Sequence, residues 1–303
     1  MLETFDQSRL ESAGPFEISD ALEQGNIVYF PECPVPLADE SDLSRMRDEL
    51  PDQLKRKNAS YHPESDSVSG LDKSAPIYDL AYRVLTSQSE VIVNFLEKAA
   101  PNLIQDATIG TSSFRPVEEK DRNLKAHASS ELIHVDAGTY GATNGDRILR
   151  FVINANPSRD RVWATKGSFR EVFERYGERA GLSGPKGHIG RLDKNILDKL
   201  RTSAINGISR IGLPKAKVLD STPYDRVMRR FHNYMKDAPE FQQDPLGYEE
   251  IQFRPYSAWM VFADGVSHAC LSGQHAFIWT CLTRLENSRF PELAPINVLR
   301  NAA

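Results

Sequence analysis

The stretch IQFRPYSAWMVFADGVSHACLSGQHAFIWTCLTRL, residues 251–285, decides the fold. Its two ends, 251–263 and 275–285, are rich in β-branched and aromatic residues, a composition typical of strands. The segment between them, DGVSHACLSGQ, carries turn-forming Asp, Gly and Ser residues together with His268. We therefore expect two strong strands late in the chain, with a histidine held between them.

Further strands are expected upstream, because short β-branched and aromatic segments bounded by turn residues recur at 107–117, 147–156 and 160–164. Helices are expected before and between these strands. Residues 16–30 read as a short helix followed by the strand NIVYF, and the remaining helical segments are 39–57, 76–100 and 165–180. The Ser-, Asp-, Pro- and Gly-rich residues 58–75 read as a surface loop.

The order of these elements favours one fold class. Helices come first, then strands, then a helical insertion, then more strands, which excludes an alternating βαβ fold. We predict an α+β protein with a double-stranded β-helix core (jelly roll, cupin-like), N-terminal helices and a helical insertion between core strands. A single domain is expected over 1–303, with these parts: an N-terminal support region at 1–106, the core at 107–285, the insertion at about 186–236 and a C-terminal tail at 286–303.

Composition places the chain among globular proteins of a reducing compartment. Of 303 residues, 40% are hydrophobic and 26% charged, enough for a sizeable core. No run approaches the roughly 18 apolar residues of a membrane-spanning helix, and the acidic N-terminus shows no secretory signal. Three widely spaced cysteines predict free thiols. The cytoplasm is therefore the expected location.

Charge is distributed unevenly along the chain. Residues 1–70 hold 15 Asp and Glu against 6 Lys and Arg, whereas residues 186–236 hold 12 Lys and Arg against 4 Asp and Glu. The basic insertion contains two helical segments, 192–205 and 222–236. A basic block in a chain of net charge −5 indicates either a local anionic partner or an ordinary solvated helical surface.

The chemistry is indicated by ELIHVDAG, in which His134 and Asp136 stand two residues apart. Residues i and i+2 of a strand share a face, so this imidazole and carboxylate can bind one divalent cation. His268 is the expected third ligand, and His275 is its rival. Two histidines and a carboxylate form the facial triad of non-haem Fe(II) oxygenases, although a zinc hydrolase can use the same set.

An oxygenase of this kind that uses 2-oxoglutarate needs a cation for the far carboxylate of that co-substrate, and arginine suits it. Arg150 stands in an apolar strand and shares its parity with Asn154, a possible ligand-orienting group. Arg284 and Arg115 are the alternatives. Each arginine is equally compatible with a surface salt bridge at a strand end.

Several longer blocks occur in order between about residues 107 and 285: SFRPV, HVDAG, RILRFVINANP, RVW, YDRVMRRFHNYMKD and WMVFADGVSHACLSGQH. In these blocks the chain resembles the Kdo hydroxylases, Fe(II)/2-oxoglutarate-dependent dioxygenases of Gram-negative bacteria. That family hydroxylates C3 of the outer Kdo sugar of Kdo2-lipid A to give Ko.

The resemblance implies His134, Asp136 and His268 as iron ligands and favours Arg150 as the 2-oxoglutarate anchor. It implies Fe(II), 2-oxoglutarate and O2 as cofactor and co-substrates, with ascorbate as activator.

The implied substrate is an anionic glycolipid at the cytoplasmic face of the inner membrane, which the basic insertion suits. Arg226, Arg229 and Arg230 stand at helical steps and would contact it. Binding would then be peripheral, with no obligate protein partner.

Two other functions stay open at this point. The chain could be a 2-oxoglutarate oxygenase for a different anionic small molecule, or a cupin-like binding module without activity. We expect no nucleic-acid partner, because the basic insertion has few interleaved aromatic residues and the whole chain is negative.

Overall fold

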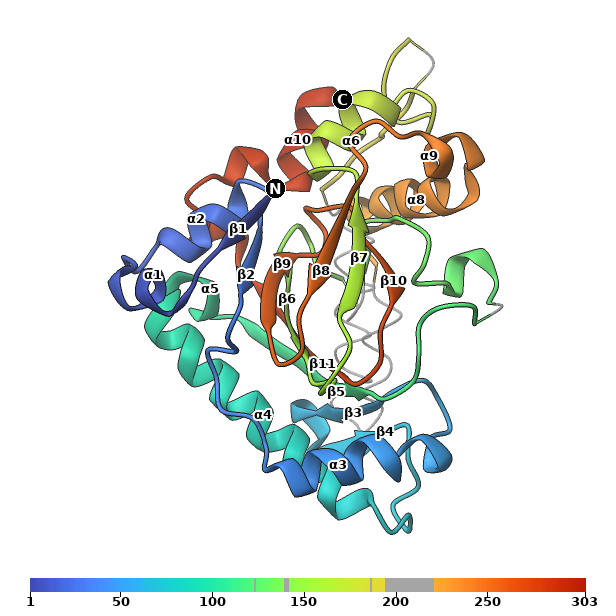
Figure 1. The fold of residues 1–303 in the computed structure, drawn as a ribbon. Helices are drawn as coiled ribbons and strands as arrows, with labels where there is room; N and C mark the ends of the chain where they lie inside the picture. The colour runs from blue at the N-terminus through green and yellow to red at the C-terminus, as the bar shows by residue number, and fades with distance from the viewer. Residues whose placement is uncertain (123, 139–141, 186, 194–220) are drawn as a thin grey trace.

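The computed structural model describes residues 1–303 except 123, 139–141, 186 and 194–220 (Figure 1). Its strands form two sheets, one of eight strands in the order β1-β2-β9-β6-β11-β5-β3-β4 and one of three in the order β10-β7-β8. The strands are β1 (Leu2–Thr4), β2 (Ile27–Phe30), β3 (Ala59–His62), β4 (Ser67–Ser69), β5 (Thr108–Arg115), β6 (Arg147–Asn154), β7 (Arg161–Thr165), β8 (Glu249–Phe253), β9 (Ala258–Phe262), β10 (Ala269–Ser272) and β11 (Ala276–Thr283).

The α-helices of the described residues flank these sheets. They are α1 (Gln7–Ser12), α2 (Glu17–Glu23), α3 (Glu40–Asp48), α4 (Tyr78–Ala99), α5 (Pro101–Ile104), α6 (Phe169–Tyr176), α8 (Pro223–Asp237), α9 (Pro239–Gln243) and α10 (Pro295–Ala302). The protein is thus a mixed α/β structure built on a large sheet, which confirms the predicted combination of helices and strands.

Strand β11 lies at the centre of the large sheet, between β5 and β6, and both pairings are antiparallel. Its side chains alternate between the two faces of the sheet. Phe277, Trp279 and Cys281 enter the largest apolar core, whereas Ile278 and Thr280 face the opposite side. The two faces of this one sheet therefore meet different environments.

Helix α4 covers the first of these faces (Figure 1). Its buried residues recur at steps of three and four, the pattern of an amphipathic helix; they include Leu85, Ile92 and Leu96. Trp279 reaches across to this helix and donates its Nε1 hydrogen to Ser89 Oγ at 3.0 Å. Helix α4 thus covers one face of the large sheet, and the other face can pack against the small sheet.

The small sheet faces the other side of the large sheet (Figure 1). Trp163 of β7 packs there against Trp259 of β9, with ring centroids 5.3 Å apart, and against Phe253 of β8. A second core joins α6, α8 and α10 at one end of this pair of sheets. The space between the two sheets is where inward-facing side chains of both meet.

Two expectations about local structure were wrong. The expected strand 251–263 is two strands, β8 and β9, because the chain turns between them at a Tyr256 of positive φ (57°). The expected surface loop 58–75 contains β3 and β4, which extend the large sheet by pairing β3 with β5. Ser60, His62 and Ser69 of this segment face a cavity described below, and Ala59, Tyr61 and Val68 enter the core.

The ends of the predicted parts also have definite structure. Residues 286–303, expected as a tail, contain α10, which buries Ile296 and Leu299. Helix α8 confirms the second helical segment of the insertion, whereas the first, 192–205, falls almost wholly outside the described residues. Among the described helices, none has the length and apolar character needed to cross a bilayer.

Candidate metal centre

Backbone pairing brings the three predicted ligands together from distant parts of the chain. His134 and His268 form an isolated antiparallel bridge in which each backbone N–H donates to the other's carbonyl, at 3.0 and 2.8 Å. The Asp136 N–H donates to Ala263 O at 2.8 Å, next to the turn that carries His268. The short segment 134–136 is therefore held against residues 263–268, the turn that leads into β10.

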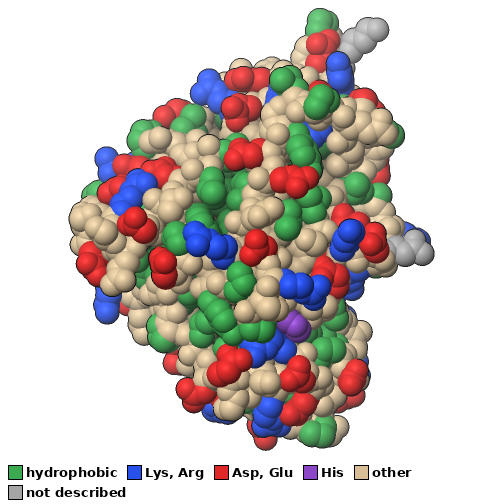
Figure 2. Space-filling view, viewed as in Figure 1, with side chains coloured by type: hydrophobic (Ala, Val, Ile, Leu, Met, Phe, Trp, Pro, Cys, Tyr) green, Lys and Arg blue, Asp and Glu red, His purple; other side chains and the backbone are tan. Residues whose placement is uncertain are grey.

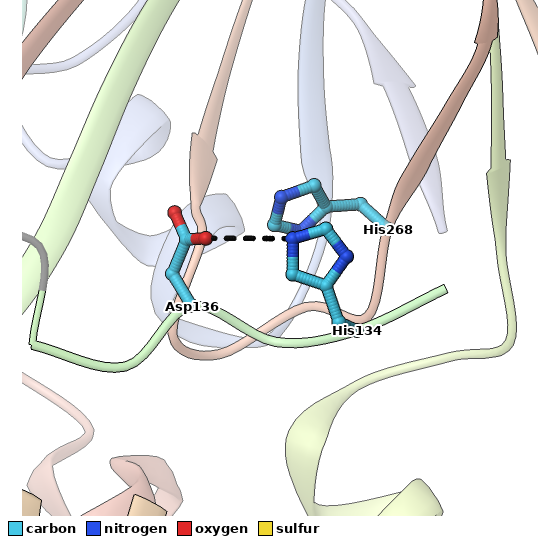
Figure 3. Close-up of side chains that lie close together, drawn as sticks. All are labelled: His134, Asp136 and His268. Carbon is cyan, nitrogen blue, oxygen red and sulfur yellow. Dashed lines mark ion pairs between the residues drawn. The ribbon is translucent and has the colours of Figure 1, made fainter. Parts of the chain in front are cut away.

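The side chains converge on one point (Figure 3). One ligand atom from each of His134, Asp136 and His268 lies within 4.8 Å of the others, and His134 Nε2 lies 3.7 Å from Asp136 Oδ1. All three residues are buried, with 4% to 8% of their surface exposed. Such a distance range allows one cation to contact all three atoms.

Hydrogen bonds fix which nitrogen of each imidazole faces this point. His134 Nδ1 lies 2.7 Å from Leu132 O, and His268 Nδ1 lies 3.0 Å from Val266 O. A carbonyl only accepts, so each Nδ1 carries the proton and each Nε2 keeps its lone pair for a metal.

The charge states also suit a divalent cation. Burial, followed by the neighbouring His268 imidazole, holds the pKa of His134 well below its usual range, and burial lowers the pKa of His268. Burial opposes ionisation of Asp136, but the charge of the Arg150 guanidinium outweighs it and lowers the pKa of Asp136 to about 2. Two neutral imidazoles and one carboxylate result, which is the donor set of an Fe(II) facial triad.

The triad opens into a cavity of about 480 Å³, which we call the triad cavity. Its lining combines apolar side chains, such as Val152, Trp163 and Ile278, with several cations. Those cations are Lys57, Arg115, Arg122, Arg150, Arg161 and Lys236. One side of the metal position is therefore held by protein ligands, and the other side faces a space able to admit an anion.

Arg150 stands next to the triad. Its Nη2 lies 2.6 Å from Asp136 Oδ2, an ion pair not aligned as a hydrogen bond. The predicted co-substrate arginine thus contacts a metal ligand, which favours a role in orienting that carboxylate. Its assignment as the 2-oxoglutarate anchor stays a prediction.

A second charged cluster lies in the same cavity and contains Arg115, a predicted co-substrate residue, together with residues that the sequence analysis did not name. Three arginines, Arg115, Arg122 and Arg161, share one buried carboxylate, Glu119. Burial opposes its ionisation, yet Arg115 and Arg161 lower the pKa of Glu119 to about 2. One carboxylate against three guanidinium groups leaves an excess of positive charge.

Arg161 is the member of this cluster with the most unused hydrogen-bonding capacity. It is 2% exposed, and its buried Nε and Nη1 have no acceptor among the described residues. Arg115 instead donates to Asn58 and Glu119. A sequence signal existed for Arg161, since it shares strand parity with Trp163, whose ring stacks on His268 at 5.2 Å.

The remaining residues that the sequence analysis proposed for the site, two for the co-substrate and one for the metal, lie elsewhere. The Asn154 amide donates to three backbone carbonyls, those of Arg159, Phe253 and Arg254, and so fixes the ends of β6 and β8. Arg284 is half-exposed and pairs with Asp146 at 2.9 Å. His275, the rival third ligand, stacks on Phe114 with ring centroids 6.4 Å apart.

The predicted substrate arginines, Arg226, Arg229 and Arg230, occupy the exposed face of α8. Arg226 donates to Ser221 O, and Arg230 donates to His188 O at 3.2 Å. The opposite face of this helix supports the triad, because His232 Nδ1 lies 2.7 Å from Val135 O. Lys236 lines the triad cavity from the same helix.

Two imidazoles and a carboxylate around one open position define the site type of the non-haem Fe(II) oxygenases. A family model described as 3-deoxy-D-manno-oct-2-ulosonic acid (Kdo) hydroxylase matches residues 7–303. The chain belongs to this family, which confirms the resemblance and the enzyme class predicted from the sequence.

Solved structures agree with this membership. The apo structure of the Kdo hydroxylase KdoO, a non-heme Fe(II) α-ketoglutarate-dependent dioxygenase, is 26% identical with a TM-score of 0.79, covering 99% of this chain and 95% of that one. The same enzyme in complex with α-ketoglutarate and Fe(III) is 25% identical with a TM-score of 0.78 and the same coverage. No curated protein matches the chain.

Proposed function

We propose that the protein is an Fe(II)/2-oxoglutarate-dependent dioxygenase that hydroxylates C3 of the outer Kdo sugar of Kdo2-lipid A to give Ko. One observation carries the proposal. His134, Asp136, His268 and Arg161 line a single cavity of about 480 Å³, and the buried Nε and Nη1 of Arg161 have no acceptor among the described residues. A metal and a dicarboxylate co-substrate would therefore meet in one place.

The strand order supports a double-stranded β-helix as the scaffold. The large sheet contains β9-β6-β11-β5, the small sheet is β10-β7-β8, and His134 pairs beside β10 as an extra short strand. Two four-stranded antiparallel layers closed in this way make a jelly roll. This scaffold holds the triad on paired backbone, so that the ligands are positioned before any metal arrives.

Fe(II), when bound, would activate O2 so that one oxygen atom enters a C–H bond while 2-oxoglutarate loses CO2 and becomes succinate. His134 and His268 would offer Nε2, and Asp136 would offer Oδ1. The contact of Arg150 with Oδ2 would keep that carboxylate turned toward the metal.

We assign Arg161 as the anchor of the far carboxylate of 2-oxoglutarate. A buried guanidinium with free N–H groups costs stability unless an anion pairs with it, and Arg161 has two such nitrogens. Glu119 already occupies part of the cluster and holds Arg161 in place, with Arg161 Nη2 at 3.4 Å from Glu119 Oε1.

The apolar lining would exclude water from the reacting carbon. Trp163 stacks on His268 with an interplanar angle of 19°, while Val152 and Ile278 line the opposite sheet. A dry cavity strengthens the ion pairs inside it. These residues would thus favour transfer of the oxygen atom to the substrate over side reactions with water.

Peripheral contact with the cytoplasmic face of the inner membrane fits the exposed arginines of α8, each worth about 1 kcal/mol near an anionic surface. Figure 2 shows Lys and Arg side chains interspersed with Asp and Glu over the face viewed there, so that face carries no broad field of one sign. The α8 arginines would instead act locally on the headgroup.

Mass spectrometry tests the function directly. Kdo2-lipid A incubated with the protein, Fe(II), ascorbate and 2-oxoglutarate should gain one oxygen atom, with one succinate released for each product. The same reaction with His134→Ala should give neither product. Succinate without a mass gain on Kdo2-lipid A would reject this substrate and favour a different anionic acceptor.

A further inference from the structure

A second cavity, of about 410 Å³, adjoins the triad cavity. Four residues line both cavities: Lys57, Arg115, Arg150 and Ile278. We call the second space the hydroxyl cavity, because the rest of its lining is dominated by hydroxyl side chains. Those side chains are Ser60, Ser69, Thr111, Ser113 and Thr280.

The hydroxyl cavity arises because the large sheet is wider than the small one. Strands β5, β3 and β4 continue the large sheet past β11, whereas the small sheet has only three strands and the bridge at His134. On these outer strands, residues such as Tyr61, Val68 and Phe114 enter the core beneath α4. Alternation then turns Ser60, Ser69 and Ser113 to the opposite, cavity-facing side.

The hydroxyl groups form short local networks that leave capacity for a ligand. Ser113 Oγ donates to Ser60 Oγ at 2.8 Å, and His62 Nε2 lies 2.8 Å from Ser69 Oγ. A hydroxyl has one donor and two acceptor positions, so the contact of Ser60 with Ser113, and the further contact of Ser113 with Thr111 Oγ1 at 3.5 Å, leave acceptor positions on Ser60 and Ser113 for a ligand. An array of this kind matches a polyol better than an apolar or aromatic ligand.

The cavity is also positively charged. Arg56 and Lys57 line it, and neither forms a salt bridge to a carboxylate within the described part of the chain. Repulsion from Arg115, followed by burial, lowers the pKa of Lys57 to about 8, and Arg122 and Arg150 act in the same direction against Glu119. A cluster of cations with few neighbouring carboxylates is stabilised when an anion binds to it.

We infer that the hydroxyl cavity holds the Kdo sugar during the reaction, with Lys57 pairing with the sugar carboxylate and the Ser and Thr side chains bonding its hydroxyls. The inference rests on the proposed function. A 2-ulosonic acid offers one carboxylate and several hydroxyls, the two features that this cavity complements. A volume of about 410 Å³ suits a single sugar residue.

The position of the cavity agrees with the chemistry. Arg150 lines both spaces and contacts Asp136 Oδ2 at 2.6 Å, so the hydroxyl cavity lies one side chain away from a metal ligand. A sugar seated there would present a ring carbon toward the open side of the triad. The far carboxylate of 2-oxoglutarate would lie instead at Arg161, which lines only the triad cavity.

Lys57→Met tests the assignment, with Lys55→Met as the matched control. Lys55 is exposed and pairs with Asp72. Loss of one charge-assisted contact should raise the KM for Kdo2-lipid A about tenfold in Lys57→Met. The dissociation constant for 2-oxoglutarate, measured anaerobically with Fe(II), should stay within about twofold of the Lys55→Met value.

An unchanged KM for the glycolipid in Lys57→Met would overturn the inference, and so would a weakened affinity for 2-oxoglutarate alone, which would place Lys57 in the co-substrate site. Failure of the proposed function is distinguishable, because the wild-type protein would then convert no Kdo of the glycolipid to Ko.

A measurement on the wild-type protein avoids any folding defect of the variant. Acetic anhydride at pH 8 should acetylate the Lys57 amine, and saturating Kdo2-lipid A should slow this reaction at least about fivefold, since a paired ammonium is protonated and covered. Acetylation of Lys55 should not slow. Equal protection of the two lysines, or none, would reject the site.

Discussion

The two ends of the triad cavity use charge in opposite ways. At the metal end, two imidazoles are neutral, Asp136 is the single carboxylate, and Arg150 pairs with it. At the other end, Arg115, Arg122 and Arg161 surround Glu119 alone, and two nitrogens of Arg161 have no acceptor among the described residues. The first end brings three ligand atoms to a position that a metal cation could occupy, and the second has guanidinium nitrogens without an anion.

This difference shows what each end is built to receive. Buried groups are normally paired, so a consistent deficit marks the place of a ligand. Under the proposed function, a divalent cation would complete the first end, and a carboxylate would complete the second. A dicarboxylate that reaches from one to the other is the simplest molecule to satisfy both.

The largest expected effect comes from removing a ligand at the metal end. His268→Ala should lower succinate release by at least about 1000-fold, because two remaining ligands no longer hold the cation in place. Fe(II) binding measured by calorimetry should be lost with it. His275→Asn, a matched change at the rival histidine of positive φ (55°), should keep activity within about threefold.

If His275→Asn abolished iron binding while His268→Ala kept it, the ligand set would be His134, Asp136 and His275. The assignment of His268 as the third ligand would then be wrong.

The second largest effect concerns the stability of the fold at acid pH, which depends on Glu119 at the arginine end of the triad cavity. The pKa of Glu119 is about 2 when folded, against 4.5 when unfolded. The ionised carboxylate therefore stabilises the fold above pH 4.5, by about 3 kcal/mol, and this stabilisation is lost as the pH falls from 4.5 toward 2. Urea unfolding at pH 5 and pH 3 should show it.

The wild type should lose about 2 kcal/mol more than Glu119→Gln over that interval, since all other carboxyls titrate in both proteins. Equal losses in the two proteins would mean that Glu119 is not held ionised by the arginines. Glu49→Gln, at an exposed carboxylate, is the control and should behave as the wild type.

The metal end could be predicted from the sequence, whereas at the other end the sequence analysis named only Arg115. His134 and Asp136 share a short motif, and His268 is flanked by strong strand signals, so pattern and spacing suffice. The Glu119 cluster joins residues from β5, the following loop and β7, and only the folded chain shows which arginine keeps free nitrogens.

The same limit applies to the wide part of the large sheet. Residues 58–75 read as a loop because Ser, Asp, Pro and Gly dominate, yet β3 and β4 form there against β5. Short polar strands with one buried face follow tertiary context more than intrinsic propensity. Because the polar residues of this segment are typical of a loop, the sequence analysis predicted neither the strands nor the hydroxyl cavity.

A third test compares Arg161, which only the structure points to, with Arg284, which the sequence analysis named as an anchor candidate. Arg161→Met should raise the KM for 2-oxoglutarate about 30-fold, since a buried charge-assisted contact is worth about 2 kcal/mol. Arg284→Met should leave it within about twofold, because Arg284 pairs with Asp146 at a half-exposed position. A reversed ranking would return the anchor to the end of β11.

The smallest expected effect separates Arg150 from Arg161. Arg150 contacts Asp136 Oδ2, so Arg150→Met should weaken Fe(II) binding about tenfold, the usual cost of losing a group that orients a ligand. Its KM for 2-oxoglutarate, measured at saturating Fe(II), should change less than that of Arg161→Met. If Arg150→Met instead weakened 2-oxoglutarate and left iron affinity intact, Arg150 would be the anchor, and the unpaired nitrogens of Arg161 would call for another anion.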